Sequence, residues 1–203
     1  MILNNDLHHA SINQTTGTGG DGISFNDSQQ SGNVIRGNRI WRNHDDGIDM
    51  WNGAHVLLEG NWIWQNGYDD NLVKTSGNGV GVKLGGDGTG DGSHTVRLNL
   101  IWHNGEDGIN DNNADNPCNV YNNTSWDHGN SGRYNYNFSH GVAHVLKNNL
   151  SVAGNGVSLD GSVVQDHNSW NTSPGVTVTS GDFVATDFTA NIGARKADGS
   201  LPD

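Results

Sequence analysis

The phrase Gly37-Asn38-Arg39-Ile40-Trp41 returns 23 residues later as Gly60-Asn61-Trp62-Ile63-Trp64. Shorter versions of it follow at Asn99-Leu100-Ile101-Trp102, Asn123-Thr124-Ser125-Trp126 and Asn149-Leu150-Ser151-Val152. The asparagines of successive phrases are 23, 38, 24 and 26 residues apart, and the longest step contains a glycine-rich insertion around residues 85–93. A recurring unit of this length is typical of solenoid proteins.

Short apolar segments lie on both sides of the phrase. Val56-Leu57-Leu58 precedes the second copy, and Asp46-Gly47-Ile48-Asp49-Met50 follows the first. Three short strands per repeat, with no helical period anywhere, predict an all-β fold, a right-handed parallel β-helix with three sides. We expect residues 1–203 to form one such domain, incomplete at one or both ends. We also expect the recurring asparagines to stack into a ladder, in which each amide bonds its neighbours and the backbone.

The composition agrees with many turns and excludes some partners. Only 32% of the residues are hydrophobic, 30 are glycine and 3 are proline, and the net charge is −12. Glycine and asparagine tolerate the backbone conformations that turns require. An acidic chain argues against nucleic acid as a partner, and no apolar run is long enough to span a membrane. Cys118 is the single cysteine, so no internal disulfide forms. We expect a monomer.

The tryptophans at the end of each phrase form a column whose role the pattern leaves open: Trp41, Trp64, Trp102 and Trp126. They alternate with the isoleucines of the same strands, so one residue of each pair points away from the core. The column is either part of a hydrophobic core or an exposed strip on which sugar rings stack.

Aligning the segments that follow the phrases by their core residues brings polar side chains together. The residues that then point outward form one column: Ser24, Asp49, Lys83, Asn110 and Ser158. Because stacked strands lie roughly 4.8 Å apart, Asp49 and Lys83 should be direct neighbours on the solvent face.

Four carboxylates converge near that column. Asp21 stacks on Asp46 two positions ahead of the core isoleucines, with Asp45 beside it and Asp49 following. Such a cluster is repulsive unless a cation binds, and all-oxygen ligands favour Ca²⁺ over Zn²⁺. Asp46 and Asp49 point to opposite faces of a straight strand, so we expect a bend at Gly47. The alternative interpretation is a solvated acidic turn.

Several motifs of the chain resemble family 9 of the polysaccharide lyases, the pectate lyase family that includes exopolygalacturonate lyases. They are Asn43 to Trp51 and Gly81 to Gly86, Arg133 to Ser139, His144 to Asn149, Asp166 to Asn171, and Arg195 to Pro202. Members of that family are longer, and the resemblance implies that this chain lacks several N-terminal rungs.

The resemblance implies a catalytic Ca²⁺ held by four aspartates, with a lysine as Brønsted base. Matched motif to motif, these positions are Asp21, Asp45, Asp46 and Asp49 for the metal and Lys83 for the base. It further implies secretion and an anionic polysaccharide, polygalacturonate, as substrate. The first residues of the chain carry no signal-peptide pattern, so the expectation of secretion rests on the resemblance alone.

A lyase of this kind would remove the C5 proton of a uronate, after which the 4-O-glycosidic bond opens. Lys83 must be neutral to take that proton, which leads us to expect an alkaline optimum. The simpler alternative for Lys83 is a cross-strand ion pair with Asp49. Two other functions remain open: a β-helical glycoside hydrolase that acts on pectin through paired carboxylates, and a solenoid that binds glycans without catalysis.

Overall fold

The computed structural model of the chain describes residues 1–11, 19–25, 31–86, 89–129, 132–172, 176–183 and 192–202. Within these ranges the chain forms nineteen β-strands of two or three residues each, and the only helical element is a 3₁₀ turn, η1 (Ser180–Asp182). The prediction of an all-β fold is confirmed. No helix in the described part of the chain is long and apolar enough to cross a membrane.

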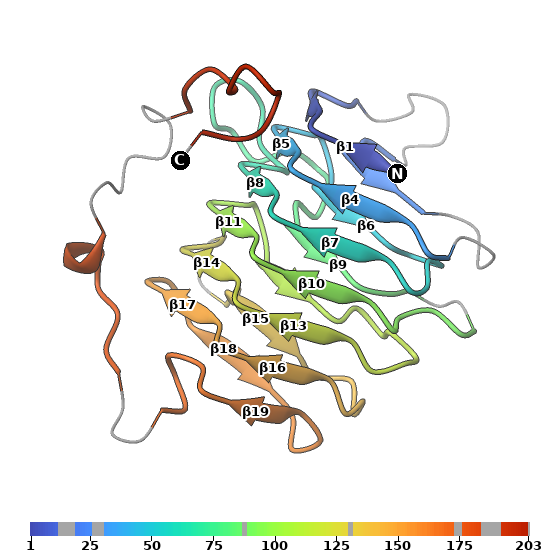
Figure 1. Cartoon of the computed structure of the whole chain (residues 1–203), viewed down its shortest axis with the longest axis vertical. Helices are drawn as coiled ribbons and strands as arrows, with labels where there is room; N and C mark the ends of the chain where they lie inside the picture. The colour runs from blue at the N-terminus through green and yellow to red at the C-terminus, as the bar shows by residue number, and fades with distance from the viewer. Residues whose placement is uncertain are drawn as a thin grey trace.

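The strands form three parallel sheets, and each turn of the coil adds one strand to each sheet (Figure 1). Sheet 1 contains β1 (Ile2–Leu3), β4 (Val34–Arg36), β7 (Leu57–Glu59), β10 (Thr95–Arg97), β13 (Asn119–Tyr121), β16 (Val145–Lys147) and β19 (Val164–Asp166). Sheet 2 contains β2 (Asp6–His8), β5 (Arg39–Trp41), β8 (Trp62–Trp64), β11 (Leu100–Trp102), β14 (Thr124–Trp126) and β17 (Leu150–Val152). Sheet 3 contains β3 (Ile23–Ser24), β6 (Ile48–Asp49), β9 (Val82–Lys83), β12 (Ile109–Asn110), β15 (Tyr136–Phe138) and β18 (Val157–Leu159). This is the predicted parallel β-helix.

The core residues of sheet 3 fix the position of the side chains between them. Ile48, Val82 and Ile109 lie opposite one another on successive rungs and are fully buried. Burying such a side chain stabilises the fold by about 1.5–3 kcal/mol. A register shift of one residue would turn these side chains to solvent, so the outward residues that alternate with them are held in line.

The outward column of sheet 3 differs from the prediction at one rung. Asp49, Lys83 and Asn110 are successive neighbours, as expected. The next residue is Asn137 on β15, and Ser158 follows only one rung later. The core residue of β15 is Tyr136, and an aromatic residue in place of Ile or Val hides this rung from a search for the aliphatic pattern.

Two asparagine ladders run along the coil, one just before and one just after the strands of sheet 2. The predicted ladder is confirmed by side-chain hydrogen bonds of 2.9–3.2 Å that link Asn5, Asn38, Asn61, Asn99, Asn123, Asn149 and Asn168. A second ladder, not predicted from the sequence, links Asn43, Asn66 and Asn104. It ends at His128, whose Nδ1 accepts the backbone N–H of Asn104 at 3.2 Å.

The tryptophan column lies on the outer face of sheet 2 and forms a second hydrophobic core. The rings of Trp41, Trp64 and Trp102 stack with centroids 4.9 Å apart, and Trp64 and Trp102 are only 2% and 1% exposed. The C-terminal part of the chain runs along this side of the coil (Figure 1). Val178, Phe183 and Ile192 pack against the column, and the ring of Phe183 contacts that of Trp126. Of the two interpretations left open by the sequence, the core is correct for these buried rings.

Candidate active site

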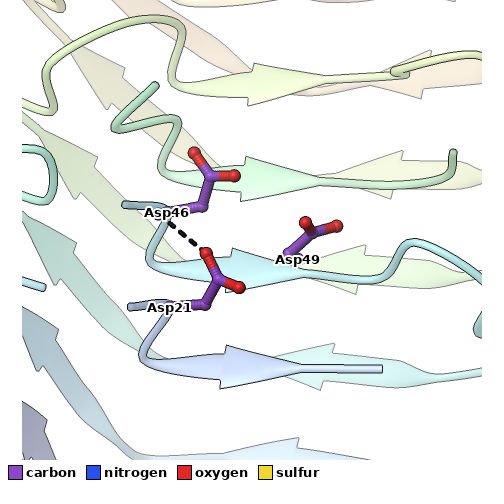
Figure 2. Close-up of side chains that lie close together, drawn as sticks. All are labelled: Asp21, Asp46 and Asp49. Atoms are coloured by element: carbon purple, nitrogen blue, oxygen red, sulfur yellow. Dashed lines mark hydrogen bonds between the residues drawn. The ribbon is translucent and has the colours of Figure 1, made fainter. Parts of the chain in front are cut away.

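The outer face of sheet 3 brings together Lys83 and three of the four predicted carboxylates. Asp49 lies opposite Lys83 in the strand register, and the backbone N–H of Asp46 donates to Oδ1 of Asp21 at 3.0 Å. Asp21, Asp46 and Asp49 each have an oxygen within 4.8 Å of the others. Figure 2 shows the three carboxyl groups gathered beside β3 and β6.

The backbone bends at Gly47, as the convergence of Asp46 and Asp49 requires. No other residue fits there, because a Cβ on Gly47 would lie 2.6 Å from the carbonyl oxygen of Gly81 and 2.8 Å from the side-chain amide of Asn66. The bend therefore packs against the next rung and against the second asparagine ladder, and both hold Asp46 in place.

Asp45, the fourth predicted carboxylate, does not join this group. Its Oδ1 accepts the backbone N–H of Asn78 at 2.6 Å, and it is absent from the set of converging carboxylates. It still lies close enough for its charge to help raise the pKa of Asp21, Asp46 and Asp49.

Burial makes the ionised forms of these carboxyl groups unfavourable. Asp46 is fully buried, and burial raises its pKa to about 7 although Lys83 and a hydrogen bond from Val80 act in the opposite direction. Burial likewise raises the pKa of Asp49 to about 6, with Asp21 and Asp45 adding to the effect. Such groups ionise together only with added positive charge close by.

Lys83 supplies part of that charge, with a partner that differs from the expected one. Its Nζ lies 2.5 Å from Oδ2 of Asp46, whereas the sequence pointed to Asp49 as the ion-pair partner. Burial alone would lower the pKa of Lys83, but the negative charges of Asp46, Asp49 and Asp45 raise it overall. Without a metal ion, Lys83 is therefore held in its protonated form.

The group fits a hard cation. Oδ1 of Asp49 is buried and has no hydrogen-bond partner among the described residues. An unpaired buried carboxylate oxygen is costly, and a cation between it, Asp21 and Asp46 would satisfy it. The ligands are all oxygen, which is the set that Ca²⁺ prefers.

Trp51 adds an aromatic surface that the sequence analysis did not single out. It follows Asp49 by two residues, is 38% exposed, and lies against Gly86, where a Cβ would come within 2.7 Å of the indole ring. The sequence offered one indication of its role. Trp51 directly follows the acidic motif and, unlike the tryptophans of the column, does not end an asparagine phrase.

The fold and this group define a parallel β-helix protein with a candidate metal centre on one sheet. A sequence profile of the family described as "Pel9A-like, right handed beta helix region" matches residues 1–149. The chain belongs to this Pel9A-like family, which also establishes the right-handed coil and confirms the family resemblance.

Individual relatives agree with the family assignment. The chain is 31% identical to pectate lyase L of Dickeya chrysanthemi over 206 residues, which cover all of this chain and 47% of the relative. It is 32% identical to pectate lyase PEL9 of Emericella nidulans, with 91% of this chain and 49% of the relative covered. The crystal structure of pectate lyase Pel9A superposes with a TM-score of 0.83 at 31% identity, over 99% of this chain and 50% of that one. The chain thus spans about half the length of the relatives it matches.

Proposed function

We propose that this chain carries the catalytic face of a calcium-dependent pectate lyase, which cleaves α-1,4-linked polygalacturonate by β-elimination. The single observation that carries the proposal is the contact between Lys83 and the converging carboxylates on one sheet face. The similarity to pectate lyases over the whole chain supports the substrate class.

Asp21, Asp46 and Asp49 would hold the calcium ion, and a modest rotation of Asp45 away from Asn78 would complete the predicted set of four. A bound calcium ion would supply the positive charge that stabilises the negative charge developing on the substrate carboxylate when the C5 proton is lost. Asp46 fixes the position of Lys83, because the ammonium group, which comes from the next rung, lies 2.5 Å from its Oδ2.

Lys83 is the proposed base. Its neutral amine takes the proton from C5, the electrons of that bond form the C4–C5 double bond, and the C4–O bond breaks. The leaving oxygen takes a proton from water, the Lys83 ammonium group returns its proton to solvent, and the new chain end is an unsaturated sugar. The carboxylates that keep Lys83 protonated in the metal-free protein are the proposed metal ligands, so engaging them with calcium favours the neutral amine.

Trp51 offers a flat apolar surface for a sugar ring beside the proposed metal ligands. Because the proposed substrate is a polymer too large to enter a cell, we also propose that the protein acts outside the cell.

The deciding experiment measures the ultraviolet absorbance of the unsaturated product on polygalacturonate, with calcium and with a chelator. A lyase gives absorbance that the chelator abolishes. New reducing ends without absorbance, unaffected by the chelator, would instead indicate a hydrolase with paired carboxylates. Polymer binding without either product would indicate a glycan-binding solenoid.

A further inference from the structure

An amide cluster on sheet 3 repeats the geometry of the candidate metal centre two rungs farther along the coil. Its three members, named here the amide cluster, are Asp107, Asn110 and Asn137. They take the places that Asp46, Asp49 and Lys83 take in the metal centre.

The two aspartates have the same environment on one side. Oδ1 of Asp107 accepts the backbone N–H of Tyr134 at 2.7 Å, as Oδ1 of Asp46 accepts that of Val80 at 2.7 Å. Both carboxyl groups are buried, at 1% and 0% exposure. Each therefore fastens the turn of the following rung.

The second oxygen distinguishes the two groups. Oδ2 of Asp46 faces an ammonium group, whereas Oδ2 of Asp107 accepts the side-chain amides of Asn110 at 2.7 Å and Asn137 at 2.9 Å. Neutral amides thus replace both charged partners. Asp107 is compensated by N–H donors alone, and no cation is needed there.

The hydrogen bonds that fix the two amides leave part of their donor capacity unused. An asparagine side chain has two N–H donors and one acceptor oxygen, and Asp107 takes one N–H from each. The oxygen of Asn110 accepts from the backbone of Asn112 at 2.7 Å, and that of Asn137 accepts from Ser139 at 3.2 Å. Among the described residues, the second N–H of each amide is left for a ligand, and both side chains are half-buried rather than fully enclosed.

The location points to the ligand. Asn110 and Asn137 continue the column of Asp49 and Lys83, so they lie about 5 and 10 Å beyond Lys83 along the coil. The charged pair beside them, Arg133 and Glu106, is mutually compensated at 2.8 Å. A polymer that follows the column from the metal centre therefore meets neutral hydrogen-bonding groups next.

We propose that the amide cluster is a subsite that binds the hydroxyl groups of a sugar unit, with Asn110 and Asn137 in contact with the sugar and Asp107 as the positioning residue. The proposal rests on the proposed function, because it takes the bound polymer to run along sheet 3. It adds a contact that is independent of charge to a site otherwise built on charge.

The test measures polygalacturonate binding by affinity electrophoresis with calcium present, in a Lys83→Ala background that prevents cleavage. Asn137→Ala should weaken binding about fivefold, the effect of one hydrogen bond. The matched control is Asn119→Ala on sheet 1, a half-buried strand asparagine on another face, which should leave binding unchanged. Because the contact is neutral, the ratio of the Asn137→Ala and parent affinities should be the same at low and high salt, unlike that of an ionic contact.

A second variant separates positioning from folding. Asp107→Asn keeps an acceptor for Tyr134 but replaces the acceptor of the two amides with a donor, so polymer affinity should fall with little change in Tm. Equal affinities of Asn137→Ala and its parent, or a ratio that shrinks with salt, would overturn the subsite. Unsaturated product that still forms in the Lys83→Ala background would count against Lys83 as the base and leave the subsite untouched.

Discussion

The Nζ atom of Lys83 lies 2.5 Å from Oδ2 of Asp46, one rung away on sheet 3. Oδ1 of the same carboxyl group is occupied by the backbone N–H of Val80 at 2.7 Å. Asp46 can therefore offer Oδ2 to a metal ion only when the ammonium group withdraws or loses its proton. The ammonium group of the proposed base and the proposed metal ion therefore compete for the same oxygen, Oδ2 of Asp46, and this competition couples the two roles.

Replacing Lys83 tests that coupling. In Lys83→Ala the elimination rate on polygalacturonate should fall by the roughly 10²–10⁴-fold ascribed to general base catalysis. Calcium affinity, measured by calorimetry, should be unchanged or higher, because Asp46 loses its competing partner. Lys83→Arg should be nearly as inactive, since guanidinium does not give up its proton.

The control for Lys83 is Lys147→Ala, which removes an exposed lysine that pairs with Asp166 on sheet 1 and should keep full turnover. Should Lys83→Ala retain most of the wild-type rate at alkaline pH, Lys83 is only an ion-pair partner and the base lies elsewhere.

Asp46→Asn tests the metal centre without disturbing the turn, since the amide oxygen can still accept from Val80. Calcium affinity should fall by more than the roughly 10–100-fold typical of outer-shell changes, with the β-sheet circular dichroism signal intact. Asp107→Asn is the matched control, because Asp107 is equally buried at the equivalent position but lies outside the metal centre. Equal calcium titrations for Asp46→Asn and the wild type would reject the site.

The site was largely predictable because the solenoid turns sequence spacing into distance. Asp49 and Lys83 are 34 positions apart, and the core residues beside them, Ile48 and Val82, are enough to align them. The turn of Asp45 toward Asn78 was not predictable in the same way. It depends on a loop outside the repeat, and no period places Asn78 beside Asp45.

The same limit applies to the tryptophans. Their alternation with core isoleucines correctly predicts an outward column, but the segment that covers it carries no repeat. Nothing in the sequence around Phe183 indicates that it packs against Trp126. The second asparagine ladder was predictable, since Asn43, Asn66 and Asn104 have the same 23- and 38-residue steps as the first.

Trp51→Ala tests the proposed sugar platform. Loss of the exposed ring should raise KM for polygalacturonate about tenfold, equivalent to roughly 1.4 kcal/mol, while calcium affinity and Tm stay near wild type. Leu98→Ala removes another exposed apolar side chain, 56% exposed and directly after β10 of sheet 1, and should change none of the three. A KM equal to that of the Leu98→Ala control would remove Trp51 from the substrate-binding surface.

His128 gives a prediction for acid stability that is independent of the metal centre. Its Nδ1 accepts from Asn104, so Nε2 must carry the proton toward Ser125, 2.9 Å away. Burial lowers the pKa of His128 to about 3, whereas an unfolded histidine titrates near 6.5. Between these values the unfolded state binds one more proton than the folded state. The free energy of unfolding therefore decreases as pH falls below about 6.5, by up to roughly 1.4 kcal/mol per pH unit for this residue.

His128→Asn should remove that contribution, because asparagine continues the ladder of Asn66 and Asn104 and does not titrate. Urea unfolding at pH 7, 6 and 5 should show that the free energy of unfolding of the variant increases relative to that of the wild type as pH falls. The expected difference in slope is that of one proton, up to roughly 1.4 kcal/mol per pH unit. The other buried histidines, His94 and His144, keep their lowered pKa in both proteins and cancel in the comparison. Parallel stability curves for His128→Asn and the wild type would show that His128 takes up a proton in the folded protein as readily as in the unfolded one, which the hydrogen bond from Asn104 to its Nδ1 does not allow.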